Sequence, residues 1–278
     1  MKVFKTKAKL LSYLSACRQS KSVGFVPTMG ALHSGHLHLI EASKKECQIT
    51  ICTIFVNPTQ FNNPDDFANY PNTLDSDLEK LQKLNCDIVY APSINDVYAK
   101  SEKAKEFDFG TLANVMEGGF RPGHFNGMAT IIEKFFNIIS PTKAFFGQKD
   151  LQQLQIVKAL VKQMNAPIEI GSIPTTREKN GLAMSSRNKL LSQSAKNKAT
   201  LIYNCLNYCL TNKEKGIENL KLHITHQFGQ QENLQLEYAE FVDLNTLLPI
   251  NKWQGKNESA ICIAAYIDGV RLIDNIIL

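Results

Sequence analysis

Apolar residues in the first part of the chain follow two patterns, which are short β-branched runs and longer stretches with helical spacing. Continuous β-branched runs are typical of strands covered on both faces, and apolar positions three or four residues apart are typical of amphipathic helices. Their alternation predicts an α/β fold with a Rossmann-like parallel sheet. After a short strand and a helix within residues 1–22, the predicted strands are 23–28, 49–58, 86–93, 143–148 and 168–174, and the predicted helices are 35–46, 73–84, 125–139 and 150–164.

Two stretches interrupt this alternation. A polar loop follows residue 58, and Thr73 or Asp75 is available to cap the helix after it. The segment 92–125 is rich in Gly and Pro, which predicts an irregular region that carries functional loops.

The pattern changes after Pro174, where a polar segment leads into two helical stretches, 193–210 and 217–228. A strand is predicted over 236–244, followed by a hairpin over 259–278 that turns at Asp268 and Gly269. This change predicts a Rossmann-like domain over 1–174 and a smaller α+β domain over 175–278, with a lid or hinge near 175–190.

Composition narrows the class of protein. The 278 residues carry a net charge of +5, which suits anionic small molecules as well as RNA. No apolar run approaches the ~18 residues of a membrane helix, and the first 22 residues do not resemble a signal peptide. The seven cysteines are odd in number and lie mostly in apolar surroundings, which predicts free thiols and a cytoplasmic location. Cys205 and Cys209 have no accompanying ligands for zinc.

The sequence "HSGH" follows the first buried strand of the predicted sheet and opens a helix. The free N–H groups and the dipole of a helix N-terminus favour a phosphate, and Gly30 and Gly35 let the backbone approach closely. His33 and His36 can donate hydrogen bonds to that phosphate or, when charged, stabilise a pentavalent transition state. They could instead be polar residues without a role, or metal ligands that lack a third partner.

Two further segments suit a nucleotide. "MSSRN" (184–188) can close over a triphosphate, with Arg187 binding its oxygens, although it also fits a solvated loop. "FFGQKD" (145–150) places Lys149 and Asp150 at the carboxyl edge of the sheet, where ligands bind in such folds. Asp150 could equally cap the next helix, whereas Lys149 there opposes the helix dipole.

"FVNPTQF" (55–61) and "RPGHFNG" (121–127) supply groups for an acid substrate. Asn57 and Gln60 can bind a hydroxyl or a carboxylate, and Phe61 can wall a pocket. Arg121 and His124 can contact a phosphate or a carboxylate. The alternative for the first segment is a proline turn without a role, and the alternative for the second is a capped helix start. The position that these segments share with the others, at strand ends, is therefore what predicts a single site.

Six segments, "PTMGALHSGHL", "FVNPTQF", "YPNTL", "RPGHFNG", "FGQKDLQQL" and "REKNGLAMSSRN", together resemble the pantothenate synthetase (pantoate–β-alanine ligase) family of the HxGH nucleotidylyltransferase superfamily. They run in the family's order from about residue 23 to residue 190. The resemblance implies that pantoate attacks the α-phosphate of Mg-ATP, giving pantoyl adenylate and pyrophosphate. The amine of β-alanine then displaces AMP to give pantothenate.

The resemblance also implies site residues and partners. His36, His33 and Lys149 would be catalytic, Gln60 would contact pantoate and β-alanine, and Gln153 and Asn57 would contact substrate. We expect His36 to donate a hydrogen bond, because attack by a carboxylate needs no proton. Mg²⁺ and a homodimer are implied, and neither nucleic acid nor membrane is expected as a partner. The implied ATP-binding residues are Met29, Gly30, Ala31, Leu32, His33, Ser34, Gly35, His36, Gly147, Gln148, Lys149, Asp150, Thr176, Met184, Ser185, Ser186 and Arg187.

Three residues depart from the family pattern, namely Asn72 in place of arginine, Asn180 in place of aspartate and Met128 in place of valine. The Mg²⁺ ligands stay open among Asp75, Asp77 and Asp150. Two other functions are considered, which are an HxGH transferase that stops at the adenylate or joins another amine, and a nucleotide sensor or RNA-binding protein. The sequence shows no basic run interleaved with aromatic residues and no RNA-binding signature.

Overall fold

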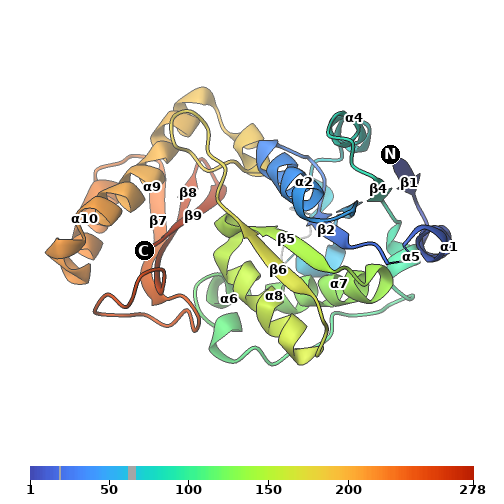
Figure 1. Cartoon of the computed structure of the whole chain (residues 1–278). Coiled ribbons are helices and arrows are strands. Elements are labelled where there is room, and N and C mark those ends of the chain that lie inside the picture. The colour runs from blue at the N-terminus through green and yellow to red at the C-terminus, as the bar shows by residue number, and fades with distance from the viewer. Residues whose placement is uncertain (19, 62–66) are drawn as a thin grey trace.

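A six-stranded, fully parallel sheet forms the centre of the first part of the chain (Figure 1). The computed structural model describes residues 1–18, 20–61 and 67–278. The strand order is β1-β4-β3-β2-β5-β6. The strands are β1 (Lys2–Phe4), β2 (Val23–Thr28), β3 (Ile49–Ile54), β4 (Ile88–Tyr90), β5 (Lys143–Gly147) and β6 (Glu169–Ile173).

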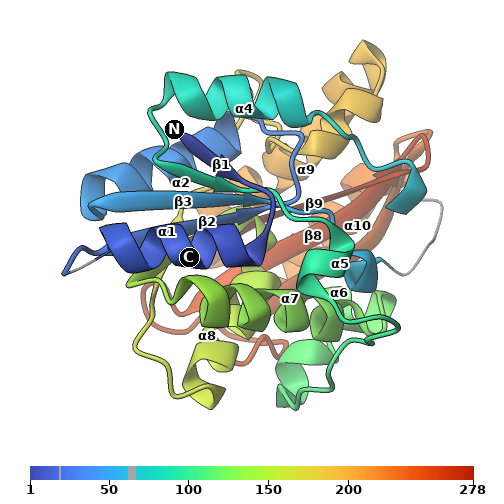
Figure 2. The same cartoon turned by 90° about the vertical axis from the view of Figure 1, so that its right-hand side faces the viewer.

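Helices cover both faces of this sheet, as the view in Figure 2 shows. One face carries α2 (Ser34–Glu46) and α4 (Leu74–Lys83), and the other carries α1 (Lys7–Cys17), α7 (His124–Ile139) and α8 (Leu151–Gln163). This layering buries the central strands on both sides and confirms the predicted α/β class.

Three local predictions need correction. The strand predicted over 49–58 ends at Ile54, because Pro58 begins the 3₁₀ turn η1 (Pro58–Gln60). Thr73 is the N-cap residue of α4 as predicted, but its hydroxyl bonds the Asp77 side chain and makes no cap hydrogen bond to the backbone. The irregular region contains short helical turns, which are α5 (Ile94–Val97), η2 (Gly110–Ala113) and α6 (Glu117–Phe120). The predicted polar loop after η1 lies partly outside the described residues.

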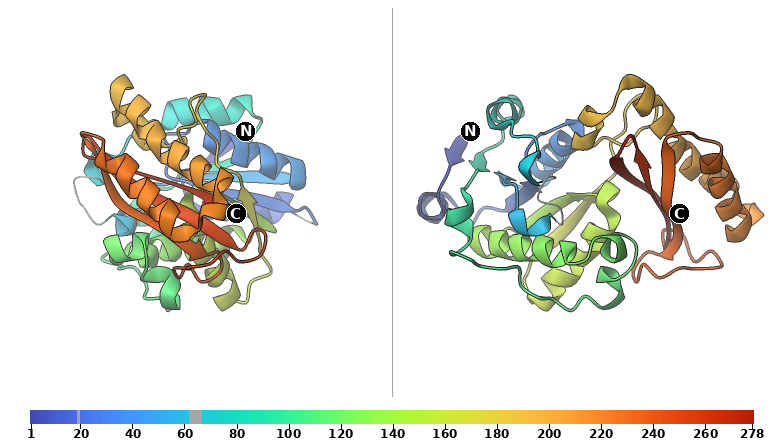
Figure 3. Two further views of the ribbon diagram at one scale, coloured as in Figure 1. Left: turned by 90° about the vertical axis from the view of Figure 1, so that its left-hand side faces the viewer. Right: turned by 180° about the vertical axis from the view of Figure 1, so that it is seen from behind.

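The last hundred residues form a second layer of structure beside the parallel sheet (Figure 3). Its three antiparallel strands are β7 (Leu234–Asp243), β8 (Ser259–Ile267) and β9 (Val270–Ile277). Helices α9 (Gln193–Thr211) and α10 (Ile217–Gly229) pack on the outer face, away from the parallel sheet. The predicted hairpin is confirmed, since Asp268 (φ 49°) and Gly269 (φ 78°) turn β8 into β9.

Residues after 181 have their own hydrophobic core, in which α9 and α10 pack on the antiparallel sheet. The opposite face of that sheet packs against the first part of the chain, because Val242, Ala260 and Cys262 join the core of the parallel sheet. The two parts therefore meet along a buried interface. Among the described residues, no helix is long and apolar enough to cross a membrane.

Candidate active site

The candidate active site lies where the chain order of the parallel sheet reverses. β2 connects through α2 to β3 on one side, whereas β5, reached from α7, lies on its other side. The loops that leave β2 and β5 therefore diverge and open a crevice at their carboxyl ends, which is the usual ligand position in such sheets.

The structure brings most of the predicted site residues together in one pocket at this crevice. Gly30, Ala31, Leu32, Ser34 and Gln148 do not line its wall, and they shape the loops behind it. The predicted residues that do line the pocket are Met29, His33, Gly35, His36, Asn57, Gln60, Gly147, Lys149, Asp150, Gln153, Thr176, Met184, Ser185, Ser186 and Arg187.

The two histidines are held by the start of helix α2. His33 is the N-cap residue, and its Nδ1 accepts the backbone N–H of Gly35 at 3.1 Å. His36 Nδ1 accepts the backbone N–H of His33 at 3.3 Å, and the two rings lie with centroids 4.0 Å apart at an interplanar angle of 37°. Since both Nδ1 atoms accept, each neutral ring carries its proton on Nε2. Each therefore offers an N–H donor beyond its own backbone contact.

The environment keeps both imidazoles neutral. Burial lowers the pKa of His33 to about 4, and the nearby Lys149 ammonium acts in the same direction. Burial also places the pKa of His36 well below its usual value, as do His33 and Lys149. Of the two roles considered from the sequence, the structure thus favours neutral hydrogen-bond donors over charged imidazoles.

The loop before α2 is fixed by a buried carboxylate. Asp77, on α4, accepts the backbone N–H groups of Ala31 and Leu32, each at 2.8 Å. Gly30 (φ 84°) and Ala31 (φ 51°) are both left-handed, so these N–H groups turn toward α4. Lys80, one turn further along α4, donates to the Leu32 carbonyl at 2.9 Å. Helix α4 therefore sets the position of the HSGH segment.

Two other segments, distant in sequence, bond the two loops that carry the predicted nucleotide residues. Ser186 donates its hydroxyl to the Ala31 carbonyl at 3.2 Å, which ties "MSSRN" to the loop before α2. Asn275, on β9, donates to the carbonyls of Gln148 and Lys149 at 3.0 and 2.8 Å. Lys149 lies 3.3 Å from the Asp150 carboxylate, and Asp150 makes no side-chain cap for α8. Asp150 is therefore the N-cap residue of α8 by position, as the alternative from the sequence has it, but its side chain does not cap the helix.

The opposite wall of the pocket is built by turn η1 and helix α7. Asn57 is buried, donates to the Gly127 carbonyl at 3.0 Å and accepts the Tyr98 hydroxyl at 2.7 Å. A side chain at residue 127 would lie 1.9 Å from the Thr59 carbonyl oxygen, so only glycine permits this packing. Asn57 thus positions the turn that presents Gln60.

The departures from the family pattern are local. Asn180 accepts the Leu182 backbone N–H at 3.2 Å, a bond that aspartate could also accept. Met128 is buried and lines the pocket, so it occupies volume beside the expected pantoate. Asn72 is exposed.

Sequence reasoning missed several residues that organise the site. Asp77 was considered only as a metal ligand, and Asn275, Glu117 and Arg271 were not singled out. No local motif marks them, because each acts on residues 35 or more positions away in the chain. Among the described residues, no cluster of three His, Cys, Asp or Glu side chains could hold a metal.

A parallel sheet with neutral HxGH donors at a helix N-terminus, facing a lysine and a serine–arginine loop, defines a nucleotide-binding protein of the HxGH type. Comparison with known proteins identifies the family within this class. The family model of pantoate–β-alanine ligases matches residues 2–277. The chain belongs to this family, and its activity is the ATP-dependent condensation of pantoate with β-alanine to pantothenate.

Relatives of known identity align over nearly the whole chain. The pantothenate synthetase of Christiangramia forsetii is 45% identical over 284 residues, covering 100% of this chain and 99% of the relative. The crystal structure of pantothenate synthetase from Thermus thermophilus superposes with a TM-score of 0.93 at 34% identity, covering 99% of both chains. A Francisella tularensis ligase, complexed with β-γ ATP and β-alanine, gives 0.84 at 36% identity, covering 100% of this chain and 97% of that one.

The neutral histidines predict a pH dependence of stability. His33 and His124 each have a folded pKa of about 4, mainly through burial, against about 6.5 when unfolded. The unfolded chain then binds more protons between these values, so the free energy of unfolding should fall as pH drops from 6.5 toward 4. Urea unfolding at several pH values measures this slope. His124→Asn should flatten it relative to the exposed-histidine control His226→Asn, and equal slopes in the two variants would contradict the assignment.

Proposed function

We propose that the condensation runs in this pocket through a pantoyl adenylate. An oxygen of the pantoate carboxylate forms a bond to the α-phosphorus of ATP, and the bond to pyrophosphate breaks. The neutral amine of β-alanine then forms a bond to the acyl carbon and gives up a proton to solvent, and AMP leaves with the electrons of the acyl–oxygen bond. The observation that carries this proposal is the convergence of neutral donors, a lysine and two neutral amides on one crevice.

The nucleotide side of the pocket would act by hydrogen bonding and charge. The N-terminus of α2 and the Nε2–H groups of His33 and His36 would bind the phosphates, and Lys149 would offset the charge that develops on the transferring phosphorus. The "MSSRN" loop would close over the nucleotide, with Arg187 on phosphate oxygens. Because the substrate carboxylate is itself the nucleophile, positioning and charge stabilisation are sufficient for catalysis.

The acid substrates would occupy the opposite wall. Gln60 would bind pantoate and β-alanine, and Gln153 would bind pantoate. Met128, Ile131 and Phe135 line the same pocket, so they would cover the hydrocarbon part of pantoate. Asn57 would contribute by holding the Gln60 turn, because its own amide is engaged with Gly127 and Tyr98.

Mg²⁺ fits this pocket as a companion of ATP. Mg²⁺ is commonly held by substrate phosphates and one or two carboxylates. Asp150 lines the pocket, whereas Asp77 already accepts two backbone N–H groups and Asp75 is exposed on α4. Asp150 would therefore supply the protein ligand, and the metal would neutralise phosphate charge.

We also propose a homodimer, which sedimentation would test, and a cytoplasmic location, supported by seven free cysteines.

ATP–pyrophosphate isotope exchange tests the adenylate step. With pantoate present and β-alanine absent, labelled pyrophosphate should enter ATP, and omission of pantoate should abolish the exchange. Adding β-alanine should then release AMP and pantothenate. AMP release that does not depend on β-alanine would favour the alternative transferase. Absence of both exchange and β-alanine-dependent AMP release would overturn the proposal.

A further inference from the structure

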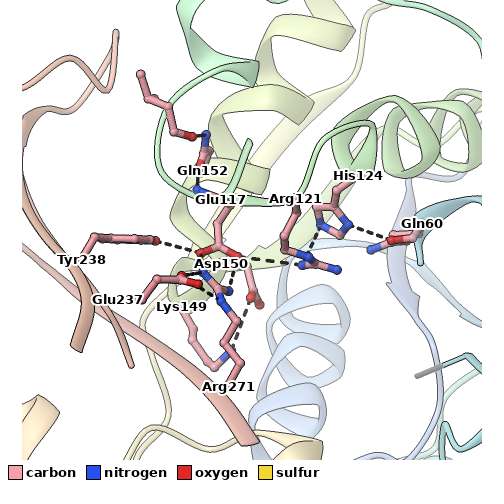
Figure 4. Close-up of polar contacts among 11 residues, drawn as sticks. Gln60, Glu117, Arg121, His124, Lys149, Asp150, Gln152, Glu237, Tyr238 and Arg271 are labelled. Carbon is pink, nitrogen blue, oxygen red and sulfur yellow. Dashed lines mark hydrogen bonds and ion pairs between the residues drawn. The ribbon is translucent and has the colours of Figure 1, made fainter. Parts of the chain in front are cut away.

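A buried charge cluster joins the C-terminal sheet to the pocket (Figure 4). Its centre is the Glu117 carboxylate on α6, which is buried. Arg271 on β9 binds both oxygens of Glu117, at 2.6 and 2.7 Å, and the Tyr238 hydroxyl on β7 donates to the same carboxylate at 2.8 Å. Arg271 also pairs with Glu237 on β7. Two strands of the C-terminal sheet therefore hold one side chain of the first domain.

Glu117 is ionised in this setting. Burial raises the pKa of its carboxyl group, but the hydrogen bonds and charge of Arg271 outweigh that effect, and the net shift is downward. Breaking one partner of such a buried pair leaves the other charge uncompensated. The pairing therefore ties α6 to the C-terminal sheet, because loss of either charge would leave the other buried and unpaired.

The same cluster continues to the substrate side of the pocket. Arg121, one turn after Glu117, lies 3.8 Å from its carboxylate and 3.2 Å from His124 Nε2. His124 Nδ1–H donates to the backbone carbonyl of Gln60 at 2.9 Å. Burial lowers the pKa of His124 to about 4, so its neutral ring donates through Nδ1 and accepts from Arg121 through Nε2. Figure 4 shows these side chains in sequence from Arg271 to Gln60.

Glu117 is also tied to helix α8. Its backbone N–H donates to the Gln152 Oε1 atom at 3.0 Å, and the Gln152 amide donates to the carbonyls of Leu112 and Val115, each at 2.7 Å. Gln152 precedes Gln153, the other proposed pantoate contact. The cluster therefore contacts the chain at Gln60 and next to Gln153, the two amides proposed to bind substrate. The HSGH loop is anchored separately by Asp77.

We propose that Glu117 is a positioning residue that links the seating of the C-terminal sheet, through Arg121 and His124, to the position of Gln60 in the substrate pocket. This inference rests on the proposed role of Gln60 in binding pantoate and β-alanine. It assigns Arg271 and Tyr238 the task of holding Glu117, and it gives the C-terminal sheet an influence on substrate binding that is separate from the contact of Asn275 with the Gln148 and Lys149 carbonyls.

Steady-state kinetics of Glu117→Gln and Arg271→Lys test the positioning role. Each should raise the KM for pantoate roughly 5- to 30-fold, with the KM for ATP changed by less than about 2-fold, because Asp77 holds the HSGH loop independently. Tyr238→Phe, which removes a single hydroxyl, should give a smaller rise. Thr111→Val is the matched control, since the Thr111 hydroxyl bonds the Thr246 carbonyl across the same two parts of the chain but away from the pocket.

A double-mutant cycle examines the connection itself. Glu117→Gln and His124→Ala change residues that act through one chain of contacts, so their effects on pantoate KM should combine to less than the product. A double variant whose rise in pantoate KM equals the product of the two single rises would overturn the proposal. Equal rises in the KM for ATP and pantoate would also overturn it, as would a lower melting temperature with both KM values unchanged.

Hydrogen exchange separates this inference from the proposed function, because it needs no turnover. In Glu117→Gln, amides of residues 56–61 should exchange faster than in the wild-type protein and in Thr111→Val. Unchanged exchange there would overturn the positioning role whether or not the protein ligates pantoate. Faster exchange in a protein that shows no β-alanine-dependent AMP release would support the coupling and refute the function.

Discussion

His36→Ala should lower kcat by about 10²–10³-fold, whereas His36→Gln should retain much more of the activity. The wild-type ring is neutral, with Nδ1 accepting the His33 N–H, so it can offer Nε2–H to a phosphate. Glutamine keeps an N–H donor at similar reach and alanine removes it. A residue that stabilises developing charge by hydrogen bonding is replaceable by another donor, whereas a proton donor is not.

The rate of pantoate-dependent ATP–pyrophosphate exchange measures this difference directly. His226→Ala, an exposed histidine on α10, is the control and should leave the rate unchanged. Equal losses in the alanine and glutamine variants would count against the hydrogen-bond role. A wild-type rate that rises as pH decreases through 6.5, and a glutamine variant insensitive to that change, would instead indicate a charged imidazole.

The sequence predicts the fold well because the fold depends on local patterns. Buried runs such as 23–28 and amphipathic stretches such as 150–164 each specify an element through their own residues, and the structure contains these elements with small shifts at their ends. The pocket was also predictable, because the carboxyl ends of parallel strands meet at one edge. Six segments named from the sequence, with lining residues from Pro27 to Arg187, converge there.

Residues that hold the site in place were not predictable in the same way. Arg271 meets Glu117 across 154 positions in the chain, and Asp77 meets Ala31 across 46. Glu117 lies in a segment expected to be irregular, and Asp77 has the sequence context of an acidic residue in the first turn of a surface helix. Burial gives both carboxylates their roles, and burial of a charged residue follows from the assembled fold rather than from its neighbours in sequence.

Asp77→Ala should destabilise the protein by about 3–5 kcal/mol and weaken ATP binding at the same time. The substitution leaves the N–H groups of Ala31 and Leu32 buried without their acceptor, and it removes the partner of the Thr73 hydroxyl. The N–H groups of Ala31 and Leu32 are turned toward α4, so the loss of the carboxylate removes the acceptor that fixes the loop. The HSGH segment would then lose its fixed position beside the phosphates.

Urea unfolding and ATP titration of the same variants separate an anchoring role from a metal-binding role. Asp77→Asn should lie between wild type and Asp77→Ala, since its amide keeps one acceptor oxygen but turns an NH₂ group toward a backbone donor. Asp75→Asn, an exposed acid in the same helical turn, should change stability by less than about 0.5 kcal/mol. An Asp77 that served as a Mg²⁺ ligand would give the opposite pattern. Its loss would leave the free protein as stable as the wild type and would weaken binding of Mg-ATP alone.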